Sequence, residues 1–151
     1  AYFANPKKRV ICTIGDGSMQ MNVQELETIS HHKLPVKIFV INNDGYGLIK
    51  QTQDTWLNSH RVGVDKSSGL SLPKMKDIGK AYNIQTCEIN NHNELKEKID
   101  FVLSCDNPIL CDVKVSKDQR VNPKIEFGKP IHDMSPLLER EELKTNMIEI
   151  G

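Results

Sequence analysis

Two short polar segments of the chain hold residue types suited to bind a phosphate group. Residues 15–18 read Gly-Asp-Gly-Ser and residues 42–47 read Asn-Asn-Asp-Gly-Tyr-Gly, and each segment directly follows an apolar run. Glycines permit positive φ and a close approach of the backbone, and the N–H groups of Gly17 and Ser18 would lie at a helix N-terminus, where anions bind. The two segments therefore predict an anion-binding site.

Asp16 indicates that a cation belongs to the same site, because a carboxylate alone would repel a phosphate. Mg²⁺ suits this position, since it binds few protein oxygens and completes its octahedron with phosphate oxygens and water. Asp16, the side-chain amide oxygen of Asn43 and the main-chain carbonyl of Gly45 could be its protein ligands. The remaining ligands would be two phosphate oxygens and a water molecule, so the residues predict a metal-bound diphosphate.

Other readings of these residues stay open. A Gly-Asp-Gly turn after a strand is common by itself. A dinucleotide fingerprint needs a third glycine three positions after Gly17, where this chain has Gln20, although Asp44 could act as a ribose-binding acid. A P-loop is excluded, because neither Gly-Lys-Ser nor Gly-Lys-Thr occurs in the chain.

The elements that would position the two segments follow from the hydrophobic pattern. Residues 9–14 and 36–41 are β-branched, largely apolar runs, typical of strands buried on both faces. Apolar residues three and four positions apart predict one helix over residues 19–32. Strand, helix and strand make a βαβ unit with parallel strands, and such a unit binds ligands at the carboxyl ends of its strands.

The remainder of the chain continues this alternation after residues 44–73, which are predicted to form a long loop because they show no clear period. The whole pattern predicts an α/β fold of three layers, with a mostly parallel sheet and helices on both faces. The further elements are, in chain order, a short helix after Pro73, a strand at 84–89, a helix opened by a capping box of Asn91 and Glu94, a strand at 108–115 and a short helix at 136–147.

The composition narrows the possible partners. The chain has 151 residues with 20 basic and 20 acidic side chains, and zero net charge removes any long-range attraction to nucleic acid. No apolar run approaches the roughly 20 residues that cross a bilayer, and no signal peptide opens the chain, so no membrane partner is expected. The start at Ala1-Tyr2-Phe3, without an initiator Met, suggests a piece of something longer.

The cysteines bear on the cellular compartment. Cys12, Cys87, Cys105 and Cys111 show no Cys-x-x-Cys spacing and no neighbouring His at metal-ligand intervals. Because most of them lie in apolar runs, free buried thiols are expected rather than disulfides. A reducing, cytoplasmic location is the corresponding expectation.

The two polar segments also resemble a known motif. Gly15-Asp16-Gly17, followed after 24 residues by Asn42-Asn43, resembles the cofactor-binding motif of thiamine diphosphate-dependent enzymes. Residues 1–128 look like the C-terminal, diphosphate-binding domain of the acetolactate synthase-like branch, and residues 129–151 like a tail with a short helix. The resemblance implies the thiamine diphosphate-binding fold, with thiamine diphosphate and Mg²⁺ as cofactors. It implies Mg²⁺ ligands at Asp16, Asn43 and Gly45, and cofactor contacts at Gly15, Asp16, Gly17, Ser18, Asn43, Gly45, Tyr46, Gly47 and Leu48.

The resemblance further implies decarboxylation and carboligation of 2-oxo acids within a homodimer or homotetramer. The activating Glu is expected on a separate pyrimidine-binding domain, of the same or a neighbouring subunit, so this chain has no catalytic residue and is expected to be inactive alone. Thr52 stands where acetohydroxyacid synthases have Trp, and Lys50 and Gln51 are candidates to face a substrate carboxylate. The alternatives are the pyrophosphate-binding subunit of a simple 2-oxo acid decarboxylase, and a catalytically silent α/β interaction domain.

Overall fold

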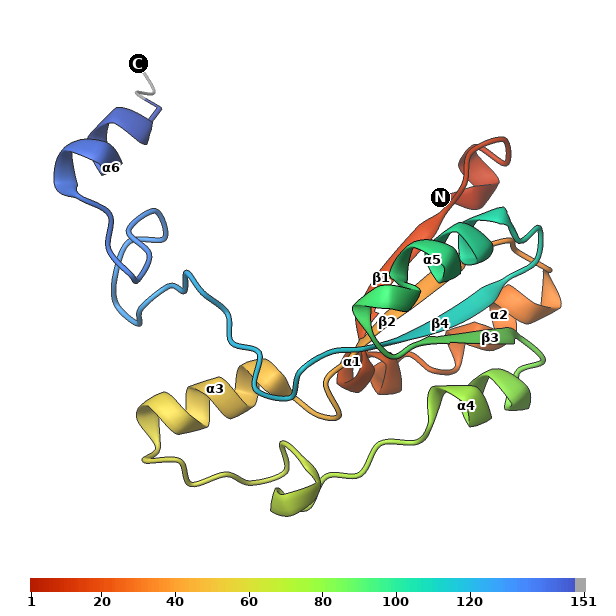
Figure 1. Ribbon diagram of the computed structural model, residues 1–151, viewed down its shortest axis with the longest axis horizontal. Coiled ribbons are helices and arrows are strands. Elements are labelled where there is room, and N and C mark those ends of the chain that lie inside the picture. The colour runs from red at the N-terminus through yellow and green to blue at the C-terminus, as the bar shows by residue number, and fades with distance from the viewer. Residues whose placement is uncertain (149–151) are drawn as a thin grey trace. The chain divides into compact units, whose positions relative to one another are not determined.

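Four parallel strands form the central sheet of the computed structural model, which describes residues 1–148 (Figure 1). The strands lie in the order β1-β2-β4-β3. The sheet belongs to the first of two compact units, residues 1–119, and the second unit begins at Arg120. The strand bounds are β1 Ile11–Gly15, β2 Lys37–Asn42, β3 Gln85–Ile89 and β4 Ile109–Lys114.

Helices cover both faces of this sheet, which confirms the predicted fold class. On one face, Ile38, Val40 and Leu110 pack with apolar residues of α1, α2 and α4, whereas on the other face Ile109 and Cys111 pack against α5 (Figure 1). Burial of these side chains supplies the main favourable free energy of the fold. The helices of the first unit are η1 Tyr2–Ala4, α1 Asp16–Met21, α2 Glu25–His31, α3 Gly47–Trp56, η2 Lys66–Ser68, α4 Met75–Ala81, η3 His92–Glu94 and α5 Leu95–Ser104.

The register of β1 and β2 brings the two polar segments together. Gly15, the last residue of β1, pairs with Ile41, the penultimate residue of β2. Both strands run in the same direction, so the loops that follow them begin at the same edge of the sheet.

The prediction that residues 9–14 are buried on both faces is wrong. β1 begins at Ile11 and is an edge strand of the sheet, and Ile11, Cys12 and Thr13 are exposed. The apolar cluster that packs against α5 includes residues of β2, β3 and β4 but none of β1, so this face of β1 lacks a covering helix. All four cysteines are free as expected, but only Cys111 is buried.

The single helix predicted over residues 19–32 is two helices. α1 begins at Asp16, directly after β1, and ends at Met21, and α2 begins at Glu25. Between them the N–H groups of Asn22, Glu25 and Leu26 donate to the carbonyl three residues back. These tighter turns interrupt the α-helical ladder while leaving Met19 and Leu26 in the same core.

The predicted loop at residues 44–73 contains a helix, α3, at Gly47–Trp56. Its apolar residues Leu48, Ile49 and Trp56 are exposed, so no stripe of core-facing residues marked it in the sequence. The predicted capping box before α5 is also shifted: the Asn91 side chain accepts from Asn93 N–H, and Glu94 accepts from Asn90 N–H.

Within residues 120–148, the second unit has one short helix, α6, at Arg140–Asn146, which is shorter than the helix predicted at 136–147. The helix begins only at Arg140, because the backbone angles of Glu139 lie outside the helical region. The Arg140 side chain forms an ion pair with Asp133. Lys124 and Ser135 exchange backbone hydrogen bonds within this unit. Within residues 1–148, no helix is both long and apolar enough to cross a bilayer.

Candidate metal and phosphate site

Asp16 links the two polar loops at the edge of the sheet. Its side chain is 2% exposed; one oxygen accepts from Gly17 N–H at 2.9 Å and the other from Gly45 N–H at 3.0 Å. Burial raises the pKa of the Asp16 carboxyl above its ordinary value, and the backbone donors oppose that rise. A buried carboxylate is costly unless a positive charge lies nearby, so the position favours a bound cation.

Three oxygen atoms can meet at one point beside Asp16. The terminal amide of Asn43 has one of its two polar atoms 2.8 Å from the Gly45 carbonyl oxygen and 3.2 Å from Asp16 Oδ1. With Nδ2 in that place, the amide donates to both oxygens. With Oδ1 in that place, three acceptor oxygens converge, and a cation bound between them would offset their repulsion.

These separations fit Mg²⁺. Neighbouring oxygens in an octahedron with metal–oxygen distances of 2.0–2.1 Å lie about 2.9 Å apart. The donor set of one carboxylate, one side-chain amide and one main-chain carbonyl is hard oxygen throughout, as Mg²⁺ prefers. Residues 1–148 hold no cluster of three or more His, Cys, Asp and Glu side chains that would suit a transition metal instead.

Glycines keep this site open. A Cβ on Gly17 would overlap the ring of Tyr46, and a Cβ on Gly47 would overlap the Asn43 amide. Beside them lies a cavity of about 400 Å³, large enough for a diphosphate group. Its lining includes all of the predicted cofactor positions: Gly15, Asp16, Gly17, Ser18, Asn43, Gly45, Tyr46, Gly47 and Leu48.

The placement of these residues differs from the expectation in one detail. The N–H group of Gly17, predicted to bind a phosphate, donates to the Asp16 carboxylate. Leu48 and Ile49, at the start of α3, give the same cavity an apolar wall together with Met21. The cavity therefore has a polar floor at the loops and an apolar side along α3.

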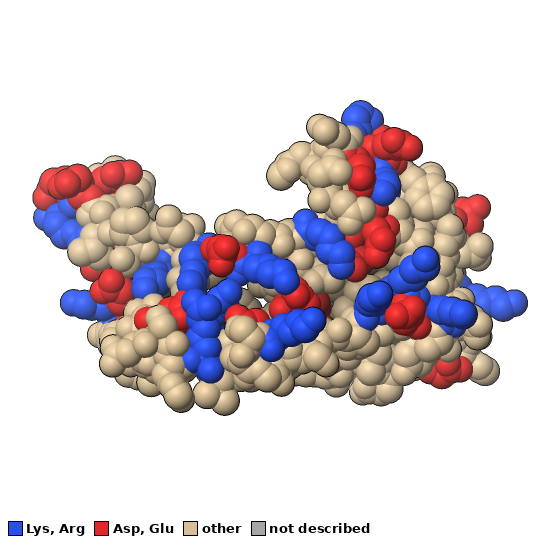
Figure 2. Space-filling model, turned by 60° about the horizontal axis from the view of Figure 1, so that its bottom comes forward, with Lys and Arg blue, Asp and Glu red and all other residues tan. Residues whose placement is uncertain are grey.

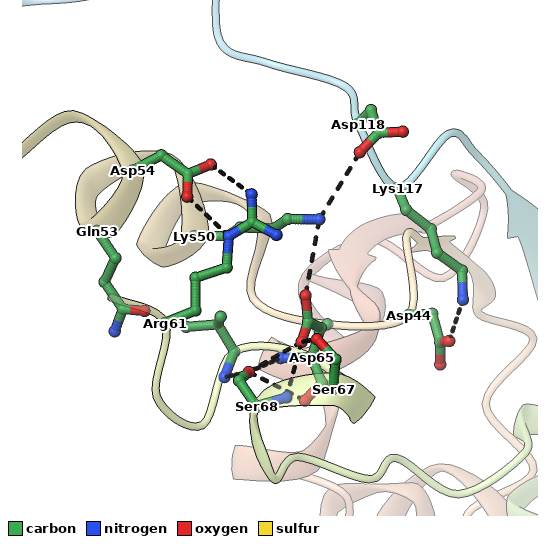
Figure 3. Close-up of polar contacts among 12 residues, drawn as sticks. Asp44, Lys50, Gln53, Asp54, Arg61, Asp65, Ser67, Ser68, Lys117 and Asp118 are labelled. Atoms are coloured by element: carbon green, nitrogen blue, oxygen red, sulfur yellow. Dashed lines mark hydrogen bonds and ion pairs between the residues drawn. The ribbon is translucent and has the colours of Figure 1, made fainter. Parts of the chain in front are cut away.

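A folded segment at residues 61–70, part of which Figure 3 shows, packs against the turn at residues 43–47. Tyr46 N–H donates to the Val64 carbonyl at 2.8 Å, and a Cβ on Gly45 would overlap that same carbonyl oxygen. Asp65 caps the N-terminus of the short helix η2, and the hydroxyl groups of Ser67 and Ser68 lower the pKa of Asp65 to about 2. The segment thus holds the turn from outside the cavity.

Lys50 contacts the segment at residues 61–70 and does not line the cavity that adjoins Asp16. Its amino group lies 3.7 Å from both Asp65 and Asp118, and its side chain is 12% exposed (Figure 3). Lys50 lines a second cavity together with Asn43, Asp44 and Gly45, and its expected role toward a substrate carboxylate stays a prediction. Arg61 and Asp54 form a bidentate ion pair that fastens the same segment to α3.

Sequence reasoning missed one buried polar side chain near the site, Asp112. It is 2% exposed in the middle of β4 and accepts a hydrogen bond from Asn42, the residue before the predicted ligand Asn43. The signal was present, because an Asp inside the run Ile-Leu-Cys-Asp-Val is unusual for a strand buried on both faces.

The fold and the site define a parallel α/β domain with a polar candidate ligand site at the carboxyl ends of neighbouring strands. The chain belongs to the thiamine pyrophosphate enzymes, since the family model described as "Thiamine pyrophosphate enzyme, C-terminal TPP binding domain" matches residues 1–113.

Relatives of the chain agree with this family. The chain is 35% identical over 138 residues to acetolactate synthase 1, chloroplastic, of Zea mays, and 33% identical over 146 residues to the acetolactate synthase large subunit of Cyanidium caldarium. It is 30% identical over 128 residues to the acetolactate synthase isozyme 1 large subunit of Escherichia coli. These matches cover 85–97% of the chain but only 22–25% of the relatives, so the chain spans about a quarter of their length.

Proposed function

We propose that the chain is the cofactor-anchoring domain of an enzyme that uses thiamine diphosphate and Mg²⁺ to decarboxylate and join 2-oxo acids, as an acetolactate synthase does. The observation that carries the proposal is the convergence of the Asp16 carboxylate, the Asn43 side-chain amide and the Gly45 carbonyl beside the cavity. The family and the names of the relatives support the choice of cofactor and reaction.

Each part of the site has a role in this proposal. Asp16, Asn43 and Gly45 would hold Mg²⁺, and the loops at residues 15–18 and 45–48 would hold the diphosphate that shares the metal. When bound, the cofactor supplies a nucleophilic carbon and an electron sink for decarboxylation and carbon–carbon bond formation. The chain's own residues would fix the position of that group, and Leu48, Ile49 and Met21 form an apolar wall along one side of the cavity.

The remaining parts of the enzyme lie outside this chain in the proposal. A pyrimidine-binding domain, of the same or a neighbouring subunit, would supply the activating Glu, and the whole enzyme would be a homodimer or homotetramer in the cytoplasm. The short coverage of the relatives supports the need for a further domain. A nucleic-acid partner is not proposed, since Lys and Arg side chains on the face drawn in Figure 2 lie beside Asp and Glu side chains.

Paramagnetic Mn²⁺ in place of Mg²⁺ tests the metal site directly. We expect Mn²⁺ with thiamine diphosphate to broaden the backbone NMR signals of residues 15–18 and 43–47 in the chain. Asp16→Ala should abolish this broadening, and Asp77→Ala, which removes a carboxylate from α4, should leave it unchanged. NMR detects even millimolar binding, so a weak affinity of the isolated chain does not defeat the test.

Two outcomes would overturn the proposal. Broadening confined to other carboxylates would mean that the converging oxygens do not hold the metal. Broadening at residues 43–47 that survives Asp16→Ala would remove the carboxylate from the site and would favour the silent interaction domain.

A further inference from the structure

The buried carboxylate of Asp112 has two donors, and neither belongs to the predicted metal site. One oxygen accepts from Asn42 Nδ2 at 2.8 Å, and the other accepts from Lys114 Nζ at 2.6 Å. Lys114 balances the charge of Asp112 at the carboxyl end of β4. Both carboxylate oxygens of Asp112 therefore have a hydrogen-bond donor, and one of these donors is the Asn42 side chain.

Asn42 connects Asp112 to the proposed metal-binding turn at residues 43–45. Its side-chain oxygen accepts from the N–H group of Asp44 at 3.0 Å, while its backbone carbonyl accepts from Val115 N–H at 2.9 Å. Since Asn42 Nδ2 faces a carboxylate and Asn42 Oδ1 faces an N–H group, the amide has a single favourable orientation. Asp112 selects that orientation.

Asp44 is the residue that most needs such support. Its φ is +59°, in the left-handed region that residues other than glycine seldom adopt. It also lies between Asn43 and Gly45, so its conformation sets the direction of both predicted metal-ligand oxygens. A hydrogen bond from Asp44 N–H to an Asn two residues earlier stabilises this type of turn.

We propose that Asp112 is a positioning residue for the metal site: through Asn42 it holds Asp44 in the left-handed conformation and thereby directs the oxygens of Asn43 and Gly45 toward one point. This inference rests on the proposed function, because that function makes Asn43 and Gly45 metal ligands. Asp112 itself does not touch the metal.

Amide hydrogen exchange of the ligand-free 151-residue chain tests the relay. In Asn42→Asp two carboxylates would face each other, so we expect exchange at Asp44 N–H to rise about tenfold or more. The double variant Asn42→Asp/Asp112→Asn exchanges the two side chains, restores a donor opposite an acceptor, and should return the rate to within about threefold of the original. Asp100→Asn, which breaks an exposed ion pair with Lys96, is the matched control and should change nothing at Asp44.

Exchange at Leu110, in the core of β4, separates positioning from general stability. A merely structural role would raise exchange at Leu110 as much as at Asp44, and that result would overturn the inference. If Asn42→Asp does not fold, Asp112→Leu removes the acceptor without adding a charge, and the same comparison of Asp44 with Leu110 applies.

The Mn²⁺ titration shows whether the relay or the proposed function has failed. Asn42→Asp is expected to bind Mn²⁺ at residues 43–45 about tenfold more weakly, with recovery in the double variant. Unchanged Mn²⁺ binding and unchanged Asp44 exchange would overturn the relay and leave the metal site standing. If the original chain shows no Mn²⁺ broadening at those residues, the proposed function fails, and with it the part of the inference that concerns the metal.

Discussion

Gly45 has no room for a side chain, whether or not its carbonyl binds a metal. Its Cα faces the carbonyl oxygen of Val64, and the adjacent Tyr46 N–H donates to that oxygen at 2.8 Å. A side chain at this point must push against backbone atoms, which cannot rotate away as a flexible side chain can.

We therefore expect Gly45→Ala to lower the free energy of unfolding by about 1–3 kcal/mol, the usual cost of overpacking. Gly15→Ala is the control, because a Cβ there meets nothing closer than Ser18 Oγ at 3.9 Å. Urea unfolding followed by circular dichroism measures both variants. Equal stability of Gly45→Ala and Gly15→Ala would show that the Val64 carbonyl moves away at little cost.

Lys37 is expected to make the free energy of unfolding depend on pH. Its side chain is 2% exposed, its amino group donates to the Asn107 carbonyl at 2.7 Å, and burial lowers the pKa of Lys37 below 10.5. Between that lowered pKa and 10.5, the unfolded chain binds a proton that the folded chain does not. The free energy of unfolding should therefore gain a contribution from Lys37 as the pH rises through this window.

Lys37→Met removes the titrating group and should remove that gain. The stability of the original chain relative to Lys37→Met is expected to increase between pH 7 and pH 10, in urea unfolding under reducing conditions. Lys80→Met, at an exposed position of α4, should show no such trend. Parallel pH curves for the original chain and Lys37→Met would contradict the prediction.

At the level of elements, α4 and β3 approach each other through Gly79. A Cβ there would overlap the Thr86 methyl group, and Gly79 also accepts a hydrogen bond from Ile84 N–H at 2.8 Å. We expect Gly79→Ala to destabilise the chain by about 1–3 kcal/mol despite the better helix propensity of Ala. Thermal unfolding of Gly79→Ala/Thr86→Ser checks the cause, since loss of the methyl group should restore part of the stability. No recovery in the double variant would place the strain elsewhere.

The elements show which parts of the structure the sequence could predict. Strands β2 and β4 are apolar runs that lie inside the sheet, as predicted, and the parallel pairing of β1 with β2 places the two polar loops at the same end of the sheet. The exposure of β1 was not predictable, because its β-branched run looks the same whether or not a neighbour covers it. α3 was missed because it turns Leu48 and Trp56 outward, and helical periodicity reports only a face directed to the core.

The candidate site divides in the same way. The sequence could predict that Asp16, Asn43 and Gly45 lie close together, because they follow the two parallel strands of a βαβ unit. The outer segment at residues 61–70 was not predictable, since its contact with Tyr46 is made by the Val64 carbonyl, a backbone group that any residue has. Asp112 acts on the turn only through a pairing of β2 with β4 across 70 residues of sequence.

For the whole molecule, the cavity has the proposed metal ligands on one side and an apolar wall on another, but few groups that could move a proton. Among the described residues, Asp16 and Tyr46 are the titratable groups that line it, and Asp16 is committed to the predicted metal. General acid–base catalysis needs a group whose pKa lies near the working pH and within hydrogen-bond reach of the proton. The cavity therefore fits the proposal that the activating Glu comes from another domain.

The corresponding prediction is that the chain anchors its cofactor without turnover. With millimolar thiamine diphosphate, Mg²⁺ and pyruvate, we expect carbon dioxide release to stay at the rate of a blank without protein. An intact acetolactate synthase in the same buffer is the positive control for the assay, and Mn²⁺ broadening at residues 43–47 shows separately that the chain is loaded. Release above the blank that disappears in Asp16→Ala would mean that this chain carries its own proton-transfer group, and that the partner domain is not needed for decarboxylation.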